Sequence, residues 1–189
     1  MNEELRGELL RMAADDSGTR EELLRAGQLP RDGYAPAMRA VHERNNARMR
    51  EIVAAHGWPG RPLVGEDGGE AAWLVVQHAT LDAEFQGACL PLLGAAVAAG
   101  AAPAWQYAYL LDRVLLARGE PQVYGTQYVW AGGGDKSVPW RIADPAGVDE
   151  RRRAIGLPTL EENTERINAE DALLSECDLP SDGLPGDEA

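Results

Sequence analysis

Residues 73–86, WLVVQHATLDAEFQ, contain the end of one apolar segment and the start of another. Four apolar residues open the stretch, and the polar Gln77 and His78 follow them. Asp82 is a residue type that caps helix N-termini. After it, apolar residues recur at the helical spacing i, i+4, i+7 and i+8, as Phe85, Cys89, Leu92 and Leu93. The stretch therefore predicts two helices joined by a short turn.

The same periodicity predicts helices on both sides of this stretch. They are expected over residues 2–29 (as one or two short helices), 37–56 and 103–119. Gly57 fits the C-terminal cap of the helix that precedes it. Asp67, with Glu70 three residues later, resembles a capping box at the start of the helix that runs into residue 78.

After the last of these helices the pattern changes to one typical of strands. Residues 122–130 (QVYGTQYVW) and 138–144 (VPWRIAD) are rich in Val, Tyr, Trp and Ile, with a glycine-rich turn at 131–137 between them. A short helix over 148–156 and another from Thr159 complete the folded part. The predicted fold class is mainly α with a small late β-hairpin (α+β), in a single compact helical domain.

A connector with two prolines and a glycine (29–36) and the acidic C-terminal segment divide the chain into three parts. We expect N-terminal helices and a connector in 1–36, a core domain in 37–169 and an acidic tail in 170–189. The net charge is −13, and residues 161–189 hold ten acidic residues against one arginine, so most of the acidity is terminal. The tail is rich in Pro and Gly and poor in bulky apolar residues, which predicts disorder.

Composition also excludes several classes of partner and location. No basic patch is visible, which argues against nucleic-acid binding. No apolar run approaches the roughly 20 residues of a membrane span, and the charged start lacks the layout of a secretory signal. Two distant cysteines give no disulfide framework. We expect a cytoplasmic protein without membrane contact, and the sequence leaves its oligomeric state open.

Two predicted helices each place one ionisable residue on an apolar face. His78 follows Ala71, Leu74 and Val75 at helical spacing. Asp112 is the one charged member of a longer apolar face. Because a buried carboxylate is costly unless it is paired, we expect Asp112 to contact His78 and to orient its imidazole. The alternatives are structural: His78 bonded to backbone, and Asp112 paired with an arginine.

The remaining histidines do not suggest a metal centre. His42 and His56 are 14 residues apart on one predicted helix, about 21 Å at 1.5 Å per residue, so they cannot share an ion. With one further histidine and no paired cysteines, we predict no metal ligands and no cofactor, and of the metal sites only a carboxylate-rich one stays open. No serine has a nucleophile-elbow context, and Cys89 falls on an apolar helix face where a thiol is usually inert.

An ordered set of short motifs resembles a known family. The motifs HGWPG, WLVVQHA, FQ, YLLDRV and YGTQ, over roughly residues 38–165, resemble the bacterial domain-of-unknown-function family 6624. The chain departs from its pattern at Leu111, where threonine is expected, and at Ala83, where proline is usual. The resemblance implies a bacterial, cytoplasmic protein and brings no reaction with it. Its pattern matches at His78, Phe85, Gln86, Asp112, Arg113, Tyr124, Gly125, Thr126 and Gln127.

Two functions follow from these residues. The first is a metal-independent acid–base enzyme, hydrolase- or lyase-like, that acts on a small molecule or peptide with His78 as general base and Asp112 as its support. Its substrate would be bound by Arg113, Tyr124, Gln127 and Trp105. The second is a non-catalytic module that binds a peptide or protein through its tryptophans, in which the polar residues are structural.

Overall fold

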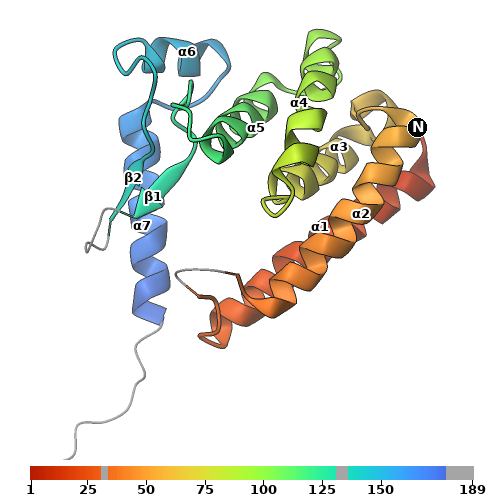
Figure 1. The fold of residues 1–189 in the computed structure, drawn as a ribbon, viewed down its shortest axis with the longest axis horizontal. Coiled ribbons are helices and arrows are strands. Elements are labelled where there is room, and N and C mark those ends of the chain that lie inside the picture. Colours follow the sequence, from red (N-terminus) through yellow and green to blue (C-terminus); the bar gives the residue numbers. More distant parts are fainter. Residues whose placement is uncertain (31–33, 131–135, 178–189) are drawn as a thin grey trace, which may run out of the picture.

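The computed structural model describes residues 1–30, 34–130 and 136–177, and these residues form seven helices and one two-stranded antiparallel sheet (Figure 1). The helices are α1 (Glu3–Arg25), α2 (Pro36–His56), α3 (Arg61–Gln77), α4 (Ala83–Ala98), α5 (Ala104–Ala117), α6 (Val148–Ala154) and α7 (Leu160–Cys177). The strands are β1 (Tyr128–Trp130) and β2 (Ser137–Pro139). The predicted mainly helical fold with a small late hairpin is confirmed.

The helices are arranged in two groups. Helices α1 and α2 lie side by side at one end of the molecule and both contact α3, while α4 and α5 pack together next to α3 (Figure 1). The hairpin, α6 and α7 form the opposite end, where α7 contacts both β2 and α6. None of the described helices is long and apolar enough to cross a membrane.

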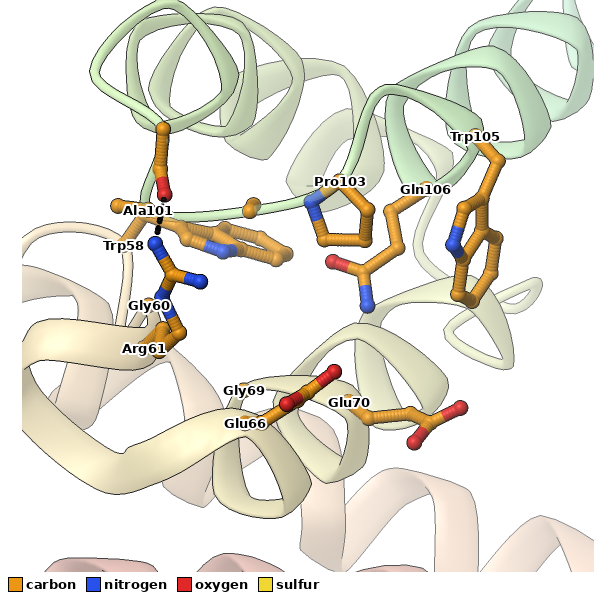
Figure 2. Close-up of a pocket in the computed structure, with 12 residues that line it drawn as sticks. Trp58, Gly60, Arg61, Glu66, Gly69, Glu70, Ala101, Pro103, Trp105 and Gln106 are labelled. Atoms are coloured by element: carbon orange, nitrogen blue, oxygen red, sulfur yellow. Dashed lines mark hydrogen bonds between the residues drawn. The ribbon is translucent and has the colours of Figure 1, made fainter. Parts of the chain in front are cut away.

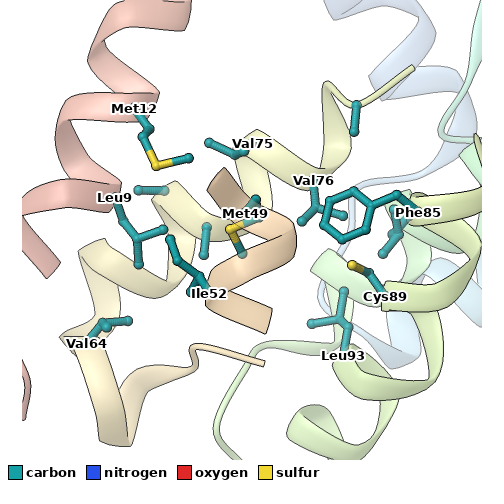
Figure 3. Close-up of a cluster of buried hydrophobic side chains, with 14 of the residues drawn as sticks. Leu9, Met12, Met49, Ile52, Val64, Val75, Val76, Phe85, Cys89 and Leu93 are labelled. Atoms are coloured by element: carbon teal, nitrogen blue, oxygen red, sulfur yellow. The ribbon is translucent and has the colours of Figure 1, made fainter. Parts of the chain in front are cut away.

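One hydrophobic core joins α1 to α5 (Figure 3). Each of these helices contributes a side chain that is almost fully buried: Leu9, Met49, Val76, Leu93 and Leu110. Burying a side chain of this size stabilises the fold by about 1.5–3 kcal/mol. Cys89 belongs to the same core, where burial raises the pKa of its thiol to about 12, so it stays protonated and unreactive.

Two of the predicted helix ends are confirmed. Asp82 caps α4, with its Oδ1 accepting a hydrogen bond of 3.1 Å from the backbone N–H of Phe85. Its carboxylate also pairs with the Arg50 guanidinium of α2 at 2.6 Å, which ties the start of α4 to that helix. Gly57 ends α2 with a φ of 69°, in the left-handed region that favours glycine.

The predicted start of the next helix is wrong. Helix α3 begins at Arg61 and is kinked at Gly65, whose φ of 77° lies outside the helical region. Asp67 follows this kink and accepts from its neighbour Gly68, while its carboxylate binds Arg6 of α1. A capping box between Asp67 and Glu70 therefore does not form, because the Asp67 carboxylate holds α1 instead.

The hairpin is shorter than the sequence predicts. β1 and β2 pair antiparallel with Val129 opposite Val138, and Gln122 makes only an isolated bridge to Ile142. Residues 123–127 form a loop rather than the predicted strand. Residues 131–135 of the predicted turn lie outside the described residues.

The predicted acidic tail begins within a helix. α7 continues through residue 170 to Cys177, so the start of this segment is helical. Residues 178–189 lie outside the described residues. The division of the chain into three parts at 36 and 169 remains a prediction, although α1 contributes to the same core as the later helices.

The turns that precede α3 and α5 meet at Gly60. The backbone N–H of Arg61 donates to the Ala101 carbonyl at 2.8 Å. A Cβ on Gly60 would lie 2.7 Å from that carbonyl oxygen, closer than real Cβ atoms approach. Gly60 is therefore required for close contact between two backbone segments.

We expect Gly60→Ala to lower the free energy of unfolding by about 1–3 kcal/mol, because the added methyl group forces the two turns apart. Gly18→Ala is the matched control, since Gly18 lies inside α1 and a methyl group added there would have no atom within 4 Å. That change should stabilise the protein by about 0.5–1 kcal/mol through helix propensity. Urea denaturation measures both, and equal effects of the two variants would contradict the packing.

Candidate functional site

A buried carboxylate on α1 lies between two imidazoles. Asp16 Oδ1 is 2.9 Å from Nδ1 of His78, the C-cap residue of α3, and Asp16 Oδ2 is 2.8 Å from Nε2 of His42 in α2. The two rings have centroids 5.7 Å apart. One donor atom from each residue lies within 4.8 Å of the other two, so three elements place three possible metal ligands around one point.

Neighbouring groups orient the His42 imidazole and hold the backbone that carries His78. The Tyr34 hydroxyl contacts His42 Nδ1, which leaves Nε2 of that ring directed at Asp16, and also lies 3.4 Å from the Thr80 hydroxyl. At the end of α3, the buried Gln86 amide donates to the carbonyls of residues 76 and 77, directly before His78. The backbone that carries His78 is therefore held by α4.

The two contacts of Asp16 differ in quality. The pair formed by His78 Nδ1 and Asp16 Oδ1 has hydrogen-bond geometry. Asp16 Oδ2 and His42 Nε2 form an ion-pair contact at 2.8 Å, but its geometry is poorer, and within the described chain neither buried atom has another partner. A buried polar atom without a well-directed hydrogen bond costs up to about 1–3 kcal/mol, so a further group bound at this point would stabilise both atoms.

The electrostatics of the cluster favour an ionised carboxylate. Burial by itself raises the pKa of Asp16, but the contacts and charges of His42 and His78 outweigh it and hold the pKa well below its ordinary value. Burial also raises the pKa of Tyr34, which keeps its hydroxyl protonated. The site therefore offers one anionic oxygen and two imidazole nitrogens.

A cavity of about 220 Å³ opens onto the cluster. Asp16 and His42 lie at its buried end, whereas the His78 side chain is 33% exposed. Apolar side chains also line it, among them Leu29, Pro30 and Met38. A small molecule could therefore reach His78 while Asp16 stays sealed from bulk water.

The predicted contact between His78 and Asp112 is wrong. The carboxylate partner of His78 is Asp16, and Asp112 accepts from a loop that follows its own helix. Four donors surround the fully buried Asp112 carboxylate: the backbone N–H groups of Val123, Tyr124 and Thr126, and the Thr126 hydroxyl. The apolar face of α5 tolerates this charge because the loop donates hydrogen bonds to both oxygens. The alternative that Asp112 pairs with an arginine is therefore wrong as well.

The same loop is held from its other side by Arg152. This buried side chain of α6 donates to the carbonyls of Tyr124 and Gly125, at 2.7 and 3.3 Å, and to Pro158 at 2.6 Å. Gly125 has a φ of 67°, a left-handed conformation in the middle of the loop. Asp112 binds the N–H groups and Arg152 the carbonyls, so the YGTQ motif forms a clamped loop that joins the two groups of helices.

The residues predicted to bind substrate do not gather around His78. Gln127 donates to Thr126 within the clamped loop, and Tyr124 belongs to the same loop. Trp105 lines a different cavity. Arg113 does not line the cavity beside His78 either, and within the described chain its guanidinium forms no ion pair and its buried Nε no hydrogen bond.

Comparison with known proteins places the chain in a family. The profile of a family of unknown function, DUF6624, matches residues 3–174. The chain belongs to this family. Searches of curated proteins and of solved structures gave no match. The DUF6624 match includes α1, so Asp16 lies inside the family region, whereas the resemblance visible from motifs begins only near residue 38.

Two members of the cluster were missed from the sequence, although a signal for each was present. Asp16 follows Leu5, Leu9 and Met12 at helical spacing, and all four are buried. His42 lies on the face of α2 that also buries Met38 and Met49. Both are ionisable residues on an apolar face, which is the feature that singled out His78. What spacing could not show is that these three faces meet.

We expect Asp112→Asn to lower the free energy of unfolding by at least about 2 kcal/mol, because an amide nitrogen would face N–H donors that the carboxylate now accepts. The control is Asp15→Asn on α1, an exposed residue paired with Arg44 at 3.3 Å, which should cost at most about 1 kcal/mol. Chemical denaturation followed by circular dichroism compares them. Equal stability of the two variants would show that Asp112 does not hold the loop.

Proposed function

We propose that the protein is a hydrolase-type enzyme that uses a divalent transition-metal ion held by Asp16, His42 and His78. Two imidazole nitrogens and one carboxylate oxygen form a donor set that suits Zn²⁺ and related ions. Three protein ligands with an open position are the usual arrangement of a catalytic zinc site. The cavity beside His78 supplies space for water and substrate at that position.

The observation that carries the proposal is the convergence of one ligand atom each from Asp16, His42 and His78 within 4.8 Å of one another. Among them, the buried Asp16 Oδ2 and His42 Nε2 are 2.8 Å apart with poor hydrogen-bond geometry. A cation bound by both would satisfy them together. The contact of the Tyr34 hydroxyl with the other nitrogen of His42 also fits, because a metal-bound histidine usually has a hydrogen-bond partner on its second ring nitrogen.

A bound ion of this kind activates water for attack at neutral pH. Around it, the apolar residues Leu29, Pro30 and Met38 would hold the less polar part of a small molecule or a peptide side chain. Arg113, from the predicted substrate-binding set, does not line this cavity. It has no ion-pair partner in the described chain, so its charge would favour a substrate whose negatively charged group reaches it.

A metal-free acid–base enzyme is the second candidate, and a specific contact favours it. His78 Nδ1 is hydrogen-bonded to Asp16 Oδ1 at 2.9 Å, so its Nε2 remains available on a partly exposed ring. In that mechanism His78 is the general base and Asp16, in place of the predicted Asp112, orients the ring. The two candidates use the same residues and differ in whether activity needs a metal.

We further propose a bacterial, cytoplasmic setting. The alanine- and arginine-rich composition, with Lys136 as the single lysine of the sequence, supports a bacterial source. The buried free Cys89 suits a reducing compartment.

Zinc binding tests the proposal. Calorimetric titration of the EDTA-treated protein with Zn²⁺ should give one site per chain. Asp16→Asn, His42→Gln and His78→Gln should each weaken binding by at least about tenfold. His56→Gln is the matched control, because His56 is an exposed residue at the end of the same helix as His42. Equal binding by all four variants would contradict the site.

An activity screen then separates the two candidates. Chromogenic esters, anilides and phosphate esters are offered to the protein, and turnover should be lost in EDTA, restored by Zn²⁺ and absent in His78→Gln. Turnover that survives EDTA but is lost in His78→Gln would favour the metal-free mechanism. Turnover that survives both treatments would overturn both.

A further inference from the structure

A second cavity lies between the first turns of α3 and the start of α5, and it shares no lining residue with the cavity beside His78 (Figure 2). Its volume is about 380 Å³. Glu66 and Glu70 lie on its α3 side, and Trp105 and Gln106 on its α5 side. The indole of Trp58 forms a further wall.

Two carboxylates in this cavity lack a cationic partner. Glu66 and Glu70 are exposed, and neither forms an ion pair or a side-chain hydrogen bond within the described chain. They are four residues apart on one helix, where two like charges repel each other and destabilise the helix. A positive charge between them would remove this repulsion.

A buried amide faces the same space. Gln106 is 3% exposed, yet its side-chain amide has no hydrogen bond to any described residue. Figure 2 shows that this amide points into the cavity with its nitrogen toward the Glu66 carboxylate, and a half-turn of the amide group presents its oxygen there instead. Buried polar groups are normally hydrogen-bonded, so the Gln106 amide is available to a ligand in this cavity.

The aromatic walls favour the same type of ligand. Trp58 and Trp105 both line the cavity, and indole rings are the aromatic side chains that attract cations most strongly. Trp105 is held edge-on against Trp73, with ring centroids 4.7 Å apart, which fixes its ring. Carboxylates, an amide oxygen and indole faces together match a cation that carries hydrogen-bond donors.

An anion is a poorer fit, although Arg61 also lines the cavity. Its guanidinium donates to the carbonyl of Gly100 at 3.0 Å. The N-terminal amides of α3 are also occupied, because Arg61 N–H donates to Ala101, and Leu63 and Val64 N–H donate to Gly60. The amides that would bind an anion at a helix start are therefore not free.

We propose that this cavity binds an alkylammonium group, either a free amine or a lysine side chain of a peptide. The ammonium would lie between Glu66 and Glu70 and donate to Gln106, and the alkyl chain would lie against Trp58 and Trp105. The site is independent of the proposed metal centre.

Binding is tested by calorimetry on the full chain with three probes: 1,5-diaminopentane, N-acetyl-lysine methylamide and the neutral N-acetyl-norleucine methylamide. At least one of the two amines should bind with a millimolar or lower Kd, and at least tenfold more tightly than the norleucine compound. Tighter binding by 1,5-diaminopentane indicates a free amine as ligand, and tighter binding by the lysine compound indicates a peptide.

Variants assign the binding to this cavity. The double variant Glu66→Gln, Glu70→Gln should weaken amine binding at least tenfold, and Gln106→Leu should weaken it as well. Glu84→Gln is the control, because Glu84 is an exposed acid in the first turn of α4 and away from this cavity. The proposal would be overturned if neither amine binds, or if the norleucine compound binds as tightly as the amines. Unchanged amine binding in the double variant would overturn it as well.

Discussion

The burial of the Asp16 carboxylate constrains the whole N-terminal part of the molecule. Removing a carboxylate from water costs several kcal/mol unless other groups replace its hydration. Here those groups are His42 from α2 and His78 from the end of α3, so the contact forms only when three helices are packed together. The hydrophobic core brings these helices together. The buried charge then fixes how they are placed relative to one another, and the cavity opens where the fixed groups meet.

A second buried carboxylate shows by contrast what is unusual about Asp16. Asp112 is fully buried, and four donors of one loop satisfy both of its oxygens. These four hydrogen bonds explain why a carboxylate is buried at this position. The Asp16 carboxylate is instead shared by two imidazoles, one of them at 2.8 Å without good hydrogen-bond geometry, beside an open cavity. A carboxylate that binds only one loop has a structural role, and a carboxylate shared by two imidazoles beside a cavity is the candidate site for a ligand.

Much of the fold follows from local patterns, but the candidate site does not. The helical periodicity of apolar residues predicted α2, α4 and α5. Asp82 begins α4 with a side-chain hydrogen bond, and Gly57 ends α2 with a positive φ. Residues 123–127 were expected in a strand, because their composition suits one, but the distant Asp112 competes for their N–H groups. His78 was recognised as a residue without a local explanation. Its partner could not be deduced, since the pairing with Asp16 depends on the packing of α1 against α3 rather than on any spacing in the sequence.

In the proposed site, Asp16, His42 and His78 surround a metal ion. Anomalous diffraction from crystals soaked in Zn²⁺, recorded at the zinc absorption edge, locates such an ion directly. We expect a single strong peak about 2.0–2.2 Å from one carboxylate oxygen of Asp16 and from one nitrogen of each imidazole. Crystals with no peak at this position, and with Asp16 still in contact with both rings, would contradict the claim.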